Sequence, residues 1–401
     1  MARSIRIARI AGTPVSVDIG LAVLAAVFIA SLTFQGFARL DPTASVGIRF
    51  VAATATVVVF LGSVLAHELG HAVLAKRNDV GVLGITLSLF GGFAQLDRQA
   101  PTPRAEFTIA AAGPAVNLII GAILAGVTAV LHGLGLLGRL ALGSLAWLAV
   151  VNIVLAIVNL FPAAPLDGGR VLTAALWKRL KDAEYARIIS GRSGLLLGAT
   201  LLVGGTIIVV LADSSVGRWQ GLIILVVGVF LFNGARGEIG AAVVRRRLAT
   251  TATGALMVPD PPAVSDSLSV EQFQRLIGPD GDGVAYPVVR WSAEPIGYVP
   301  ATAGQDLDGL DRSRTTVLDV MQATPDVARA WRNEPVDAVL KRLGMPDNLL
   351  VVIHEPSDGR AVGTLSETQI KPLLETPNLW GGDRTGNNRL RSAVIDSPRP
   401  Q

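Results

Sequence analysis

The chain has 401 residues, of which 51% are hydrophobic and 16% are charged, and its net charge is +4. Soluble domains carry about 25% charged residues, so this composition argues against a wholly soluble or disordered protein and favours a membrane protein. The absence of cysteine excludes disulfides, cysteine zinc sites and thiol catalysis. The small net charge gives no reason to expect nucleic-acid binding.

Long apolar runs are confined to the first 235 residues. Six of them approach the roughly 20 residues that a membrane-spanning helix needs. They lie near residues 17–36, 48–74, 106–131, 138–161, 191–212 and 217–235. The sequence therefore predicts an α-helical polytopic membrane domain over residues 1–240, followed by an α/β soluble domain over residues 249–375.

Basic residues indicate the orientation of the six spans in the lipid bilayer. If the N-terminus is cytoplasmic, the outer loops hold only Arg39, Arg49, Arg139 and Arg218, and the other basic residues up to residue 247 lie in inner segments. Cytoplasmic loops of membrane proteins are enriched in Lys and Arg. We therefore expect a multi-pass protein of the cell membrane with both termini in the cytoplasm.

Residues 81–97, between the second and third spans, are too short to cross a bilayer. Their alternating pattern and paired glycines predict strands or a hairpin at the membrane edge. Backbone of this kind is tolerated at membrane depth only where it is buried in protein or lines a wet cavity. Residues 4–10 also alternate and are a candidate partner for this hairpin.

The second span ends in the sequence His67-Glu68-Leu69-Gly70-His71. Two histidines four residues apart lie about 6 Å from one another on one face of a helix, so both can bind one metal ion. The glutamate between them can take a proton from a metal-bound water. Such groups are costly inside a membrane, which favours a functional site over a coincidence.

Two histidines leave a catalytic zinc site incomplete, because such a site usually has three protein ligands. His132 lies at the outer end of its span and His354 lies in the soluble half. Since there is no cysteine, the third ligand should be a carboxylate at the cytoplasmic end of another span.

Asp167 is the best candidate for this carboxylate. It follows the fourth span, where two prolines break the helix, and Gly168 and Gly169 after it permit a tight turn. Glu106 and Asp97 are the competing carboxylates.

These motifs together resemble the site-2 proteases, a family of intramembrane zinc metalloproteases. The family's hallmark is H-E-x-x-H in one span and N-x-x-P-x-x-P-L-D-G-G in a later one, which match His67–His71 and Asn159–Gly169. A further G-P-x-x-N stretch matches Gly113–Asn117, with the role of Asn117 left open between positioning substrate and bracing the core. The resemblance covers about residues 1–235.

The resemblance implies one zinc ion per chain, held by His67, His71 and Asp167. It also implies that Glu68 is the general base and acid, and that Asn159 helps to hold the substrate carbonyl or the developing oxyanion. The implied substrates are transmembrane protein segments, cleaved in regulated intramembrane proteolysis. A substrate helix must unwind to expose its carbonyl, and the hairpin at residues 81–97 offers an edge strand for the extended segment.

Two other functions compete with proteolysis. A membrane zinc transporter or sensor with a cytoplasmic regulatory tail would also need metal ligands, although a transporter should have several acidic or histidine sites along a path. A catalytically inactive scaffold is the third possibility, but His67, Glu68, His71 and Asp167 are all present.

The soluble half contains two similar units. The first runs over residues 251–299 and the second over residues 317–365, and each reads as a strand-like entry, a helix and two strands. A repeat of this kind, with a spacing of about 65 residues, predicts paired α/β modules.

The pattern is similar to a tandem pair of CBS domains over about residues 249–375. That resemblance implies a cytoplasmic regulatory module, which in some members binds an adenine nucleotide between its halves. The alternative is a structural role or the formation of a homodimer. Residues 376–401 are rich in Gly, Asn, Arg and Pro and are expected to be disordered.

Overall fold

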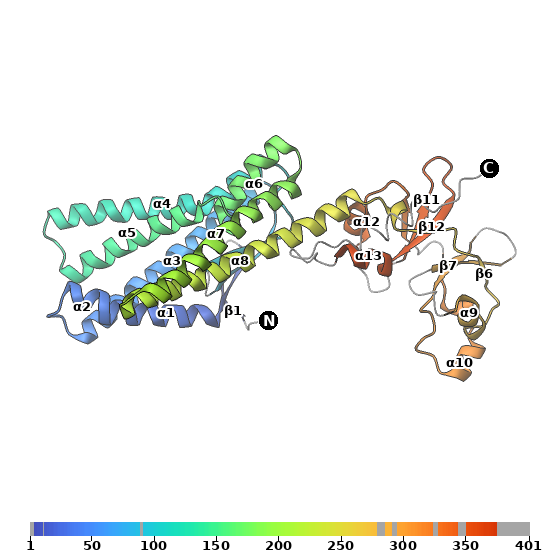
Figure 1. The fold of residues 1–401 in the computed structure, drawn as a ribbon, viewed down its shortest axis with the longest axis horizontal. Helices are drawn as coiled ribbons and strands as arrows, with labels where there is room; N and C mark the ends of the chain where they lie inside the picture. The colour runs from blue at the N-terminus through green and yellow to red at the C-terminus, as the bar shows by residue number, and fades with distance from the viewer. Residues whose placement is uncertain are drawn as a thin grey trace. The chain divides into compact units, whose positions relative to one another are not determined.

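A computed structural model of the protein describes residues 4–10, 12–88, 91–278, 285–290, 295–323, 328–343 and 350–374. The expected disordered tail at residues 376–401 lies outside this set. The chain forms two compact units, of which the first ends at Ile239 and the second begins at Gly240 (Figure 1).

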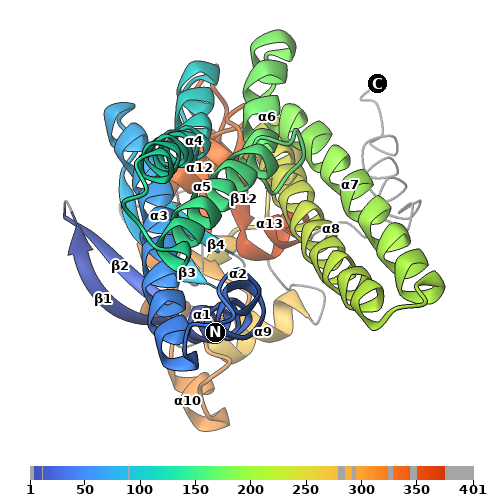
Figure 2. The same ribbon diagram turned by 90° about the vertical axis from the view of Figure 1, so that its left-hand side faces the viewer.

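The first unit contains six stretches of helix that are long and apolar enough to cross a membrane. The six predicted spans are confirmed in number and order. They are α1–η1–α2 (Ile19–Leu40), α3 (Val46–Arg77), α4 (Pro103–Gly133), α5 (Arg139–Asn159), α7 (Ala183–Leu211) and α8 (Ser215–Thr250). Viewed along the bundle, α3, α4 and α5 lie side by side (Figure 2).

Four of these helices begin at a polar capping residue. The side chains of Asp18, Ser45, Thr102 and Asp182 accept hydrogen bonds of 2.7 to 3.3 Å from first-turn backbone N–H groups. Such caps satisfy donors that the helix itself leaves unpaired. They account for the residues at which these four helices start.

A seventh helix, α6 (Asp167–Leu180), is short and was not predicted from the sequence. It packs between α4 and α7. The expectation of a tight turn at Gly168 and Gly169 is wrong, because both residues lie in the first turn of α6. A Cβ on Gly168 would overlap the backbone carbonyls of Leu160 and Phe161, so glycine is needed for close packing and not for a turn.

A four-stranded sheet flanks the helices. Its strands are β1 (Ser4–Ile10), β2 (Thr13–Asp18), β3 (Val82–Ser88) and β4 (Gly91–Leu96), in the spatial order β1-β2-β3-β4. The predicted hairpin is therefore present as β3 and β4, which pair antiparallel. The candidate pairing of residues 4–10 with this hairpin is wrong, because β2 lies between them.

One face of this sheet packs against α3. Val15, Ile85 and Leu87 are buried there with Ala72, so the sheet is anchored beside the last turns of α3. Because β4 is an outer strand of the sheet, one of its edges has no strand partner among the described residues.

The second unit contains two four-stranded sheets with the same pairing pattern. In the first, β6 (Val264–Ser265) is parallel to β7 (Ala285–Val289), and β8 (Gly297–Pro300) and β9 (Gln322–Ala323) follow antiparallel. In the second, β10 (Ala328–Trp331) is parallel to β11 (Leu350–His354), and β12 (Ala361–Ser366) and β5 (Val258–Pro259) follow antiparallel. The predicted α/β repeat is confirmed.

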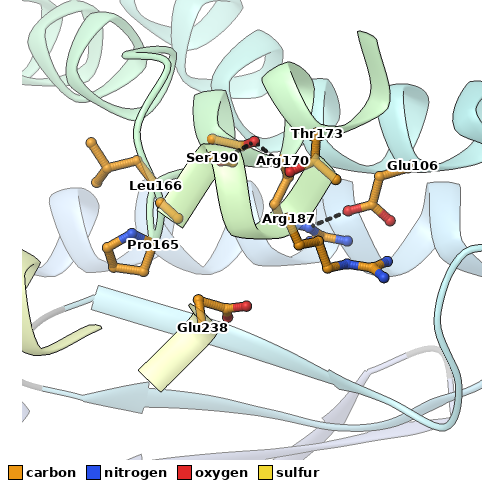
Figure 3. Close-up of a pocket in the computed structure, with 10 residues that line it drawn as sticks. Glu106, Pro165, Leu166, Arg170, Thr173, Arg187, Ser190 and Glu238 are labelled. Atoms are coloured by element: carbon orange, nitrogen blue, oxygen red, sulfur yellow. Dashed lines mark hydrogen bonds and ion pairs between the residues drawn. The ribbon is translucent and has the colours of Figure 1, made fainter. Parts of the chain in front are cut away.

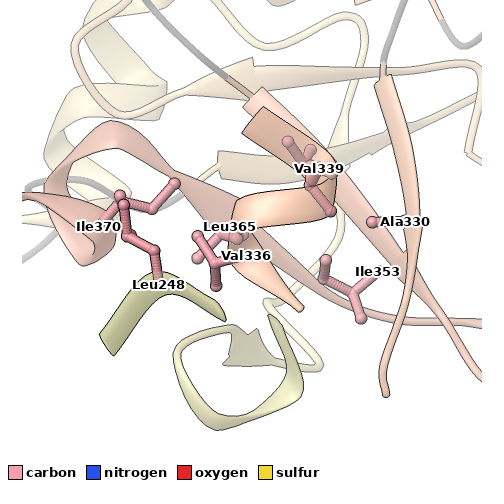
Figure 4. Packing of buried hydrophobic residues seen from close by; sticks show 8 residues of the cluster. Leu248, Ala330, Val336, Val339, Ile353, Leu365 and Ile370 are labelled. Carbon is pink, nitrogen blue, oxygen red and sulfur yellow. The ribbon is translucent and has the colours of Figure 1, made fainter. Parts of the chain in front are cut away.

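Each sheet of the second unit is completed by a strand from the other repeat. The early strand β5 joins the second sheet, and β9, at the start of the second repeat, joins the first sheet. The helices α9 (Val270–Ile277) and α12 (Val336–Leu343) connect the parallel strands. Leu248, Val336, Leu365 and Ile370 pack in one of the two cores (Figure 4).

Candidate metal centre

His67 and His71 project from adjacent turns of α3 and are both buried, with 6% and 5% of their surfaces exposed. Their Nε2 atoms are 3.1 Å apart. Asp167, the first residue of α6, places its Oδ2 atom 3.2 Å from Nε2 of His67 and 3.3 Å from Nε2 of His71. The structure thus brings together the three residues that the sequence suggested as metal ligands.

The three atoms form a nearly equilateral triangle, and its size can be compared with a zinc site. Tetrahedral zinc with bonds of about 2.0 to 2.1 Å has neighbouring ligand atoms about 3.3 Å apart. The observed separations of 3.1 to 3.3 Å match one face of such a tetrahedron. Two imidazoles and a carboxylate are also a common donor set for catalytic zinc, so these residues fit that ion.

A hydrogen bond fixes the orientation of His71. Its Nδ1 donates to the backbone carbonyl of Ile109 in α4 at 2.7 Å. Since a carbonyl only accepts hydrogen bonds, Nδ1 carries the proton and the lone pair of Nε2 is left for a metal ion. The Nδ1 atom of His67 is buried and has no protein hydrogen-bond partner.

Gly113 allows α4 to pass close to both imidazoles. A Cβ at this position would lie 2.5 Å from Nε2 of His67 and would also overlap Nε2 of His71. No other residue type therefore fits at position 113 without displacing the ligands. This gives a physical reason for the glycine of the Gly113–Asn117 motif.

Glu68 lies beside the three candidate ligands and is 5% exposed. The strand β4 covers it: the backbone N–H of Ala94 donates to its carboxylate, and a Cβ on Gly92 would lie 2.7 Å from its Cδ atom. The carboxylate is therefore held between α3 and the outer strand of the sheet.

Asp167 is positioned by hydrogen bonds from α7 to the proline-containing segment before α6 and to the first turn of α6. Ser193 Oγ donates to the carbonyl of Pro162 at 2.7 Å, and Ser190 Oγ donates to that of Gly169 at 2.7 Å. The carboxylate also lies at the N-terminus of α6, where the helix dipole stabilises negative charge.

The two competing carboxylates, Glu106 and Asp97, do not belong to the group formed by His67, His71 and Asp167. Glu106 forms an ion pair with Arg170, with 2.9 Å between Oε1 and Nε, and Asp97 accepts a hydrogen bond of 2.9 Å from the backbone of Gly81. Among the described residues, His67, His71 and Asp167 form the one group that could hold a metal ion.

Three asparagines of α4 and α5 differ in burial. Asn159 is the last residue of α5 and is half-buried. Asn117 and Asn152 are 2% and 0% exposed, and the Oδ1 atom of each has no protein hydrogen-bond partner. Among the described residues, no hydrogen bond joins Asn159 to His67, His71 or Asp167, so its catalytic role stays a prediction.

A pocket next to Asp167 was missed by the sequence analysis (Figure 3). Glu106, Arg170, Arg187 and Glu238 contribute charged groups to it, and its volume is about 80 Å³. One signal in the sequence pointed to it: Arg170 follows Asp167 by three residues and therefore extends from the same side of α6.

Comparisons with known proteins agree with this geometry. The model of peptidase family M50 matches residues 55–144 and 137–201. A relative from Mycobacterium tuberculosis, named "Putative zinc metalloprotease Rip3", is 34% identical over 80% of this chain and 80% of its own length.

Two solved structures are also similar to parts of the chain. The site-2 protease from Methanocaldococcus jannaschii is 28% identical, with a TM-score of 0.41, and the match covers 59% of this chain and 95% of that one. The CBS domain of a bacterial CNNM/CorC family Mg²⁺ transporter is 17% identical, with a TM-score of 0.27, and the match covers 33% of this chain and 92% of that one.

Proposed function

This chain belongs to peptidase family M50 and is a zinc metallopeptidase of the site-2 type, and on that premise we propose that it cleaves membrane proteins within their transmembrane segments. The observation that supports this proposal is the buried triangle of His67, His71 and Asp167 beside Glu68, at the end of an apolar helix. Ionisable groups at such a position mark a functional site.

We propose that His67, His71 and Asp167 hold one zinc ion, which supplies a polarised water and an electrophile for the peptide carbonyl. Glu68 accepts the proton of that water and passes it to the leaving amine. Asn159 donates a hydrogen bond to the oxyanion that develops on the carbonyl.

We propose that the substrate binds as an extended strand along the outer edge of β4. An edge strand offers unpaired backbone groups to another chain, and this edge lies beside Glu68. A substrate helix that unwinds there exposes its carbonyl to attack.

We also propose that both termini are cytoplasmic and that the second unit is a CBS-like regulatory module. The distribution of Lys and Arg supports the orientation. The two repeats, each completed by a strand of the other, support a paired module with a place for an adenine nucleotide or for a second copy of the chain.

The alternative of a zinc transporter or sensor has less support. Transport requires several metal-binding positions along a path, whereas a single candidate cluster occurs in the part of the chain that the structure describes. That cluster has a glutamate beside it, as hydrolysis requires.

The variant Glu68→Gln tests the proposal in purified full-length protein. It should retain bound zinc, measured by atomic emission, while cleavage of a model transmembrane substrate falls by about 100-fold to 10,000-fold, the usual effect of losing a general base. Cleavage at the wild-type rate by this variant would refute the proposed mechanism. Zinc transport into vesicles that survives the substitution would favour the transporter.

A further inference from the structure

Arg170 lies one turn after Asp167 in α6 and links this helix to α4. Its Nε atom donates to Oε1 of Glu106 at 2.9 Å (Figure 3). The Glu106 side chain is 5% exposed and that of Arg170 is 36% exposed. A buried carboxylate paired in this way is costly to leave without its partner, so the pair constrains the distance between the two helices.

Glu106 belongs to the same face of α4 that supports the two histidines. Ile109, three residues further on, accepts the hydrogen bond from His71, and Gly113, seven residues further on, contacts both imidazoles. Residues at these spacings share one side of a helix. The ion pair therefore ties the helix that bears Asp167 to the surface that orients His67 and His71.

The start of α6 depends on such links because it has no side-chain cap. Leu166 occupies the capping position and makes no hydrogen bond through its side chain. Side-chain links to two neighbouring helices hold its first turn instead: Ser190 of α7 donates to the carbonyl of Gly169, and Arg170 donates to Glu106 of α4. Of these two, the Arg170 link is the one that runs to the face supporting the histidines.

We propose that Arg170 and Glu106 are a positioning pair that holds the Asp167 carboxylate in register with His67 and His71, and so sets the affinity of the site for zinc. This inference rests on the proposed metal site. Neither residue touches the metal or the substrate. Their effect is exerted through the placement of α6 against α4.

The test is the zinc affinity of full-length protein in detergent, measured by competition with a chromophoric chelator. Arg170→Met should lower the affinity by about 10-fold to 100-fold, as is typical when a group that supports a metal ligand is lost. The double variant Arg170→Met/Glu106→Leu should lose no more zinc affinity than Arg170→Met alone, because both proteins lack the same ion pair.

Arg187→Met is the matched control. Arg187 lines the same pocket, but it bonds Glu184 and Gln99 and not Glu106. Its replacement should leave zinc affinity unchanged. An equal loss in both arginine variants, or wild-type affinity in Arg170→Met, would overturn the proposal.

Two further variants test the proposal if Arg170→Met does not fold. Arg170→Lys keeps the charge but lacks the planar guanidinium group, so its zinc affinity should fall by at least about 3-fold. An unchanged zinc affinity would overturn the proposal. In Arg170→Ala, the shortened side chain enlarges a pocket that already holds about 80 Å³, and added guanidinium should restore zinc binding.

The same measurements separate this proposal from the proposed function. If the wild-type protein and Asp167→Asn bind zinc equally weakly, the metal site itself is wrong. If the wild type binds zinc and Asp167→Asn does not, the metal site is supported. Wild-type zinc affinity in Arg170→Met would then refute only the proposal of a positioning pair.

Discussion

At the scale of single residues, the candidate zinc site depends on groups that do not bind the metal. The carbonyl of Ile109 selects the tautomer of His71, and Gly113 leaves room for both imidazoles. These contacts come from α4, whereas the histidines come from α3. The packing of α4 against α3 therefore fixes how the two imidazoles are oriented.

The substitution Gly113→Ala should lower zinc affinity by about 10-fold or more, the scale expected for the loss of a supporting contact. The added methyl group would occupy the space beside Nε2 of His67 and His71. Chelator competition measures this loss. Gly126→Ala, on the same helix, is the control, because its Cβ would meet nothing within 4 Å. Equal affinity in the two variants would contradict the argument.

The sequence predicted some of these residues and not others. The spacing of His67 and His71 revealed them directly, and the lack of cysteine together with a family motif pointed to Asp167. The ion pair between Glu106 and Arg170 could not be predicted, because it joins residues 64 positions apart through the packing of two helices.

At the scale of elements, the outer strand β4 is the part of the sheet that contacts Glu68 of the candidate site. The backbone N–H of Ala94 in this strand donates to the carboxylate of Glu68. The hairpin itself was visible in the alternating sequence. The sequence does not reveal β2, because the end of this strand overlaps the first apolar run, and it does not reveal α6, because this helix is short and amphipathic.

The substitution Ala94→Pro tests the role of β4. Proline removes the N–H that faces Glu68 and the substrate edge, so cleavage of a model substrate should fall by about 10-fold or more while zinc content is unchanged. Ile7→Pro is the control, since Ile7 lies at a bulge in the opposite outer strand β1, where proline is tolerated. If both variants cleave at the wild-type rate, substrate does not bind along β4.

At the scale of the whole molecule, the order of six spans was predictable from hydropathy alone. Polar caps and charged ends extend α3, α4 and α8 beyond their apolar runs, whereas α5 is slightly shorter than the predicted 138–161. The repeat in the second unit was also predictable. The exchange of β5 and β9 between the repeats was not, since strands of two residues carry no distinctive pattern.

The absence of cysteine makes the orientation testable with single introduced thiols. Leu136→Cys, between α4 and α5, should react in intact cells with a maleimide that cannot cross the membrane. Lys178→Cys, near the end of α6, should react only after the cells are opened. Both side chains are exposed. The opposite labelling pattern would place both termini outside the cytoplasm.

Because of the exchange of strands, some early residues find their packing partners only late in synthesis. Val258 of β5 pairs with Thr364 of β12, and Leu248 at the end of α8 packs against Ile370. These partners emerge from the ribosome about 100 residues later, which at 5 to 20 residues per second is a delay of about 5 to 20 seconds. During that interval the end of the last membrane helix has an exposed apolar surface, so a ribosome that stalls within the second repeat leaves a nascent chain suited to capture by chaperones.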